Sequence, residues 1–137
     1  CDHLSDGSGY AFCQLNPKEH GSLIQGLPIP SLFSKFPIVQ YQFYHGLVGT
    51  GAPMHMHVDA WNALTHGKKR WRIAPPFQGV YSATPVQQHS DGPQHHTMEF
   101  IQSAGDIVYI PKYWSHEVYN LQENIGYAVE FLNPYSV

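Results

Sequence analysis

Hydrophobic residues in this chain gather in short runs that are rich in aromatic and β-branched side chains and are separated by Gly, Pro and polar residues. From position 38 onward these runs are 38–48, 53–58, 61–66, 70–74, 97–101, 106–110, 115–121 and 125–132, and a further run, 10–14, precedes them. Short, closely spaced strands of this kind predict a mainly β fold, either a small antiparallel barrel or a sandwich.

One short helix is expected between the first run and the others. Asn16 and Pro17 have the pattern of a helix start, with Pro in the first helical position and Glu19 in the first turn. Gly26, followed by two prolines within four residues, predicts its end. The longest connection is 75–96, and loops of this length in compact domains border a site or are mobile.

Size and charge narrow the possible functions. The chain has 137 residues, enough for one domain, and we expect 1–137 to be a single domain cut from a longer chain. Charged residues make up only 12%, the formal net charge is −3, and the only basic cluster is 68–70, so no nucleic-acid partner is indicated. No apolar run is long enough to span a bilayer. Two cysteines are too few for a disulfide framework and assign no compartment.

The segment 53–59, PMHMHVD, carries the first candidate chemistry. His55, His57 and Asp59 lie two residues apart, so on a strand they point to one face while the methionines point to the other. A solvated strand face is the ordinary interpretation of a single H-x-H pair, and alternation by itself does not separate it from a metal site.

A second segment favours the metal site over the solvated strand face. In GDIVYIPKYWSHEVYN, residues 105–120, His116 follows a Gly-Asp turn, an apolar strand and a Pro-aromatic turn, which directs its imidazole toward the first strand if the two are neighbours. Two ligands from one strand and one from a distant strand form a facial triad with open positions, the arrangement that suits non-haem Fe(II) chemistry.

The two segments together carry a family resemblance. Residues 49–62 read G-x5-H-x-H-x4-N and residues 105–120 read G-x5-P-x4-H-x3-N, and this pair resembles the two cupin motifs. Within the cupins, AWNALTHGKKRW followed by PP, together with P-x-x-W-x-H at 111–116, is similar to the JmjC oxygenases, nearest to their small lysyl-hydroxylase-like subgroup. The resemblance extends from 10 to 133.

The resemblance implies a double-stranded β-helix (a cupin or jelly-roll barrel) with a short N-terminal helix. It also implies an Fe(II)- and 2-oxoglutarate-dependent oxygenase that hydroxylates a protein side chain and therefore takes a protein or peptide as substrate. Carried over by position, Lys69 pairs with the distal carboxylate of 2-oxoglutarate, and Asn62 and Tyr10 donate hydrogen bonds to it.

The resemblance leaves the metal pair open. Counted forward from the 49–51 turn, His55 takes the place of the family's His and His57 that of its acid; matched by residue type, the pair is His57 and Asp59, and His116 completes either set. We favour the first. An imidazole in place of a carboxylate weakens Fe(II) binding and favours other divalent ions, and Ala128 stands where a hydroxyl is expected. Two rival interpretations remain: a non-catalytic cupin module that serves as a binding or assembly domain, and a metal-dependent cupin enzyme that does not use 2-oxoglutarate.

Overall fold

The structure is a computed structural model, and it describes residues 9–78, 81–82 and 98–136. Its strands are β1 Tyr10–Leu15, β2 Ile38–Gly46, β3 Gly51–His55, β4 Ala60–His66, β5 Lys68–Ala74, β6 Met98–Ser103, β7 Ile107–Ile110, β8 Ser115–Asn120 and β9 Asn124–Phe131. The helices are α1, Pro17–Gln25, and one 3-10 turn, Pro76–Gln78. The prediction of a mainly β fold with one short helix near the N-terminus is confirmed.

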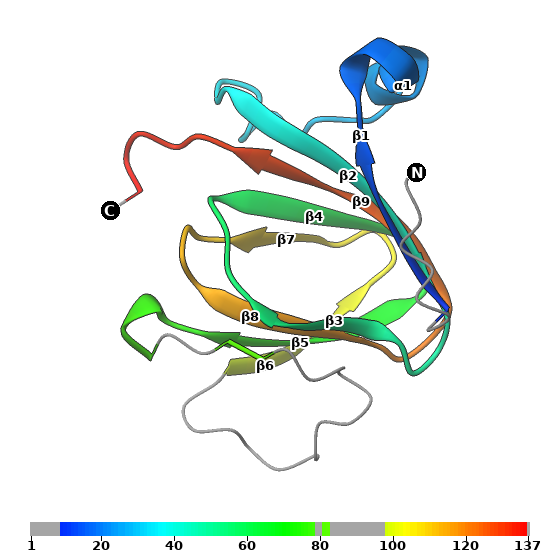
Figure 1. The fold of residues 1–137 in the computed structure, drawn as a ribbon, viewed down its shortest axis with the longest axis vertical. Helices are drawn as coiled ribbons and strands as arrows, with labels where there is room; N and C mark the ends of the chain where they lie inside the picture. The colour runs from blue at the N-terminus through cyan, green and yellow to red at the C-terminus, as the bar shows by residue number, and fades with distance from the viewer. Residues whose placement is uncertain (1–8, 79–80, 83–97, 137) are drawn as a thin grey trace.

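The strands form two antiparallel sheets that face each other (Figure 1). One sheet has the order β1-β2-β9-β4-β7 and the other β3-β8-β5-β6. Neighbouring strands are far apart in sequence, as in the pairs β2 with β9 and β3 with β8. Residues from both ends of the chain are thereby brought to the space between the sheets.

Helix α1 begins and ends where the sequence predicts. The Asn16 side chain accepts a hydrogen bond from the backbone N–H of Lys18 at 2.9 Å, and Pro17 follows as the first helical residue. Such an N-cap satisfies one of the backbone donors that a helix start leaves free. Gly26 closes the helix by donating its N–H to the carbonyls of the last turn.

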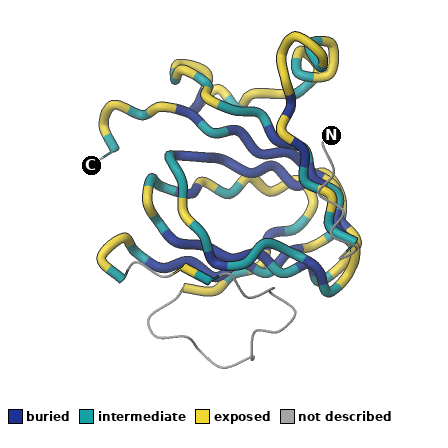
Figure 2. Tube along the Cα trace, viewed as in Figure 1, coloured by how far each residue is buried: buried dark blue, intermediate teal, exposed yellow. Residues whose placement is uncertain are grey.

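Two apolar clusters are buried in the domain, and the buried stretches of the chain follow strands of both sheets (Figure 2). The larger cluster comprises Phe33, Trp61, Ala63, Tyr127, Val129 and Phe131, and the segment that contains Phe33 covers it. Because side chains alternate along a strand, Ala128 and Glu130 of β9 point the other way, toward the space between the sheets. The smaller cluster, Trp71, Ile73, Ile110 and Val118, belongs to that inner space.

The first histidine segment departs from its predicted strand. The run 53–58 is a strand only as far as His55. Residues 56–59, called the bend below, connect β3 to β4 and turn sharply at 58 and 59. Met54 is 2% exposed whereas Met56 is 39% exposed, so the methionines do not share a face as strict alternation predicts. Most of the long connection 75–96 lies outside the described residues. Within the described part of the chain, no helix is long and apolar enough to cross a membrane.

Candidate metal and cosubstrate site

A cavity of about 300 Å³ lies between the two sheets. Both sheets contribute its lining, which includes all three motif histidines together with Lys69, Asn62 and Tyr10. Asp59 does not line it. The residues that the resemblance selects for two different roles therefore meet in one cavity.

Three imidazoles converge at this cavity. His55 is the last residue of β3 and is the cross-strand partner of His116 on β8, while His57 follows in the bend. One ring nitrogen from each histidine lies within 4.8 Å of the others. The His116 ring centroid is 4.2 Å from that of His55 and 4.6 Å from that of His57.

Backbone carbonyls fix the tautomer of each ring. Nδ1 of His55 lies 2.7 Å from the carbonyl of Pro53, and Nδ1 of His57 lies 2.7 Å from the carbonyl of Val58. Nδ1 of His116 lies 3.0 Å from the carbonyl of Trp114. A carbonyl only accepts, so each Nδ1 carries the proton and each Nε2 keeps a lone pair, as in most metal-binding histidines.

Burial keeps two of these rings neutral. It lowers the pKa of His55, an effect that the charge of Glu130 opposes. It lowers the pKa of His116 well below the ordinary value, and the neighbouring His55 and His57 add to this shift. A neutral imidazole is the form that binds a metal ion, so the group suits a divalent cation of the first transition series.

The structure does not bring Asp59 into the histidine group. Its side chain is buried, and Oδ1 accepts hydrogen bonds from the Tyr109 hydroxyl, the Ser136 hydroxyl and the backbone N–H of Lys112. The two-residue period that aligned it with His55 and His57 stops at the end of β3, which is the physical reason for the different direction.

Lys69 on β5 is 1% exposed and its ammonium faces the cavity without a carboxylate beside it. Burial lowers its pKa well below the usual value. Its Nζ lies 3.3 Å from the centroid of the Tyr44 ring, and no ion pair of Lys69 occurs within 9–78, 81–82 and 98–136. A buried cation of this kind favours an anionic ligand.

The other two predicted cosubstrate residues also reach the cavity. Asn62 is buried, and its Oδ1 accepts a hydrogen bond of 2.7 Å from the Tyr44 hydroxyl, which leaves the amide nitrogen to donate. Burial raises the pKa of Tyr10, so its hydroxyl stays neutral. Ala128 also lines the cavity and pairs with Asn62 across β9 and β4.

Three polar residues that line the cavity were not predicted from the sequence: Tyr44 and Gln42 of β2, and Glu130 of β9. Gln42 donates from Nε2 to an oxygen of Glu130 at 2.7 Å. Their signal was present as polar side chains at alternate positions of otherwise apolar strands, which marks a face that meets something polar. Glu130 supplies a negative charge to a cavity that holds three imidazoles and a buried lysine.

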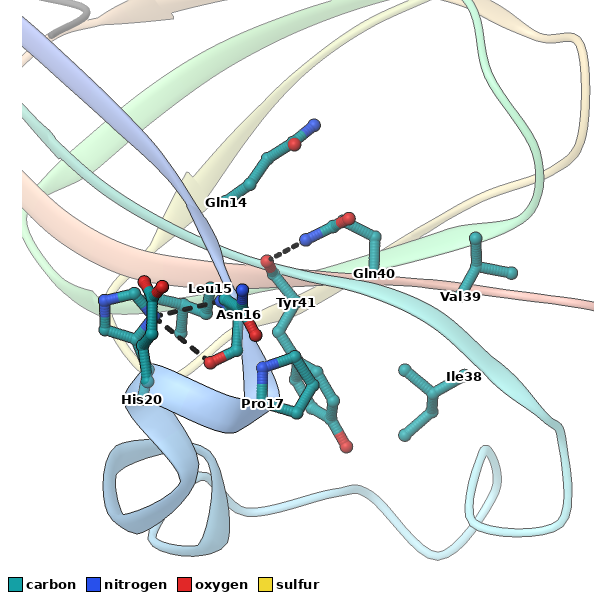
Figure 3. Close-up of a pocket in the computed structure, with 10 residues that line it drawn as sticks. Gln14, Leu15, Asn16, Pro17, His20, Ile38, Val39, Gln40 and Tyr41 are labelled. Atoms are coloured by element: carbon teal, nitrogen blue, oxygen red, sulfur yellow. Dashed lines mark hydrogen bonds between the residues drawn. The ribbon is translucent and has the colours of Figure 1, made fainter. Parts of the chain in front are cut away.

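A larger cavity, about 530 Å³, lies elsewhere, between β2 and the start of α1 (Figure 3). Asn16 and His20 are hydrogen-bonded to each other there, and Gln40 donates to the carbonyl of Tyr41. None of the predicted metal or cosubstrate residues lines it. The chemistry of the chain is therefore concentrated in the smaller cavity.

Comparison with known proteins gives a consistent family. The family model of the JmjC domain matches residues 29–137. The 2-oxoglutarate and iron-dependent oxygenase JMJD4 of Gallus gallus is 32% identical over 117 residues, which cover 71% of this chain and 28% of that protein. JmjC domain-containing protein 8 of Homo sapiens is 25% identical over 137 residues, covering 89% and 49% respectively.

Solved structures support the fold. The ribosomal oxygenase YcfD of Escherichia coli, in complex with cobalt and 2-oxoglutarate, superposes with a TM-score of 0.58 at 21% identity, covering 87% of this chain and 29% of that one. At this identity the likeness establishes the cupin-type fold. The chain spans between about a quarter and about half of the length of these relatives. The matching family model and the shared fold show that this chain belongs to the JmjC domain family.

Proposed function

We propose that this chain is the metal-binding domain of an Fe(II)- and 2-oxoglutarate-dependent oxygenase that hydroxylates a side chain of a protein substrate. One observation carries the proposal: three Nδ1-protonated imidazoles and a buried ammonium without an ion-pair partner in the described residues face one cavity. The names of the relatives, among them a 2-oxoglutarate and iron-dependent oxygenase, support the same chemistry.

His55, His57 and His116 would hold the metal through Nε2. Fe(II), when bound, would supply the activation of O2: one oxygen atom goes to a substrate C–H bond and the other to 2-oxoglutarate, which is oxidised to succinate and CO2. Asp59 is not assigned as a ligand, because its Oδ1 is already hydrogen-bonded elsewhere. The set contains no carboxylate, so other divalent ions compete more strongly than at a site with an acid.

Lys69 would bind the distal carboxylate of 2-oxoglutarate. Along β5 and β8, the pair Lys69 and Asn120 lies four residues from the pair Ile73 and His116, roughly 13 Å along the strand. The lysine side chain and a five-carbon diacid can bridge that separation together. Asn62 would donate an amide hydrogen to the same ligand.

The remaining lining orients and isolates the reactants. Trp71, Ile110 and Val118 give the cavity apolar walls, which exclude water and strengthen each charge interaction inside. Tyr10 would add a neutral hydroxyl donor, because its raised pKa keeps it protonated. Binding, orientation and exclusion of water are the tasks that a protein performs around such a cofactor.

The histidine assignment is tested by substitution and calorimetric titration with Mn(II) under anaerobic conditions. We expect His57→Ala and His116→Ala to abolish tight binding and His55→Ala to weaken it strongly, because each removes a direct coordination bond. Asp59→Ala should have a smaller effect. Normal binding by His55→Ala together with loss of binding in Asp59→Ala would show that the metal pair is His57 and Asp59.

The donor set also favours a second candidate, a non-catalytic module that uses the same fold as a binding or assembly surface. Its support is the missing acid together with Ala128, which has no hydroxyl to offer the cosubstrate. Titration with 2-oxoglutarate in the presence of Mn(II) separates the two, because only the oxygenase requires the cosubstrate to bind.

A further inference from the structure

The three histidines are not held in place in the same way. His55 and His116 are partners in the ladder between β3 and β8, so backbone pairing presets their separation. His57 lies beyond the end of β3 and has no such ladder. Something else must fix its position for three nitrogens to lie within 4.8 Å of one another.

The bend that carries His57 is bonded to the turn 111–114, which leads into β8. The backbone N–H of Tyr113 donates to the carbonyl of His57 at 2.9 Å. In the same direction, from turn to bend, the backbone N–H of Lys112 donates to Oδ1 of Asp59 at 3.3 Å. Tyr113 has φ 63°, a left-handed conformation that is strained for a bulky residue. The cross-linked turns therefore hold a backbone geometry that the sequence disfavours locally.

Asp59 is the centre of this arrangement. Asp59 is only 1% exposed. Among the described residues, none of the hydrogen bonds to its side chain comes from a cationic side chain. The Tyr109 hydroxyl on β7 donates to the same Oδ1 that accepts from Lys112. On the backbone, the Asp59 carbonyl accepts the N–H of Phe131 at 2.9 Å, which ties the bend to the end of β9.

Oδ1 of Asp59 is the acceptor that the Tyr109 hydroxyl and the Lys112 N–H share, so removing it would leave both donors without this partner. We infer that Asp59 is a positioning residue: through Tyr109 and Lys112 it fixes the bend that aims His57 at His55 and His116. This inference rests on the proposed function, because it assigns Asp59 a role toward the metal without making it a ligand.

The test is metal affinity measured separately from fold stability. Co(II) and Mn(II) alone are titrated into the purified domain, and unfolding of the metal-free protein is followed by circular dichroism. Asp59→Ala should raise the metal Kd about 10 to 100-fold, the usual cost of losing a group that orients a ligand. Asp59→Asn keeps an accepting oxygen, so its Kd should stay within about threefold of the unchanged protein.

Two further variants keep the test decisive. Tyr109→Phe removes one donor and leaves the ring, and it should raise the Kd by roughly threefold to tenfold even where Asp59→Ala does not fold. Asp106→Ala is the matched control, because its carboxylate also accepts a backbone N–H, from Ser103 at 2.8 Å, but in the turn between β6 and β7. It should lower stability and leave the Kd unchanged.

Three results would contradict the inference. An unchanged Kd in both Asp59→Ala and Tyr109→Phe would show that the hydrogen bonds of Asp59 do not position His57. Loss of binding in Asp59→Asn as severe as in His57→Ala would make Asp59 a ligand instead. Failure of the unchanged protein to bind Co(II) or Mn(II) would refute the proposed function, and the inference with it.

Discussion

Replacing Lys69 by Met should stabilise the ligand-free domain and strongly weaken 2-oxoglutarate binding. The side chain is 1% exposed and has no carboxylate partner within the described residues, and burial lowers its pKa well below the usual value. Methionine keeps an unbranched stem of similar volume and removes the ammonium. The Lys69 ammonium therefore lowers the stability of the ligand-free fold while it serves ligand binding. Its removal should change stability and 2-oxoglutarate affinity in opposite directions.

The size of the effect follows from two opposing contributions. Burying an ammonium group costs several kcal/mol even after the protein relaxes. The Tyr44 ring, whose centroid lies 3.3 Å from Nζ, offsets about 2 kcal/mol of this as a desolvated cation–π contact. Removal of the charge should thus increase the free energy of unfolding by about 1 to 3 kcal/mol, which raises Tm by about 4 to 12 °C in a domain of this size.

The pH dependence has a defined sign. Because the folded state lowers the pKa of Lys69 from 10.5, the unfolded chain binds more protons between the two pKa values. The free energy of unfolding of the unchanged protein should therefore rise with pH up to about 10.5, and the advantage of Lys69→Met should shrink over the same range.

The assay compares thermal unfolding without ligand at pH 7 and 9 with calorimetric titration of 2-oxoglutarate in the presence of Mn(II). Affinity should fall at least about 30-fold, because the ligand carboxylate loses its buried charge partner. Lys68→Met is the control, since Lys68 is exposed next to Lys69 and does not line the cavity. A lower Tm together with unchanged 2-oxoglutarate affinity in Lys69→Met would refute the reasoning.

The remaining predictions concern the cavity and its walls. Glu130→Gln should weaken Mn(II) binding several-fold in calorimetry, because it removes a negative charge from a cavity with neutral ligands; unchanged binding would exclude that contribution. Gly126→Ala should lose about 1 to 3 kcal/mol in chemical denaturation, since an added Cβ would lie 2.2 Å from a tyrosine hydroxyl and 2.4 Å from a backbone carbonyl. Gly21→Ala, which meets nothing within 4 Å, should not lose stability. Gln102→Leu should cost roughly 2 to 4 kcal/mol, measured the same way, because it leaves the buried Trp71 Nε1 donor without its acceptor and takes a donor away from two carbonyls; a neutral result would show that water replaces the amide.

Most helix and strand positions could be predicted from short sequence patterns. The Asn16-Pro17 start and the Gly26 end of α1 are encoded in a few adjacent residues, and the strand runs are encoded by composition and turn residues. These signals act over short distances, so they can be interpreted without the tertiary structure. The arrangement of strands in two facing sheets required the family resemblance in addition, because strand order depends on pairings such as β2 with β9.

The candidate site was less accessible to sequence reasoning. Alternation placed His55, His57 and Asp59 on one face, but the strand ends at His55, and Asp59 turns to a hydrogen-bonding partner on β7. The end of β3 depends on hydrogen bonds with the turn 111–114, which is 50 or more residues further along the sequence. Glu130 was missed for the same reason, because only the register of β9 against β2 brings it to Gln42.

The most direct test of the central claim is conversion of 2-oxoglutarate to succinate by the Fe(II)-loaded domain in the presence of O2. We expect O2-dependent succinate formation that is lost in His116→Ala, even before a protein substrate is known. The contrary result is a domain that binds Fe(II) and 2-oxoglutarate but forms succinate no faster than His116→Ala. This result would contradict the assignment as an oxygenase and favour the non-catalytic module.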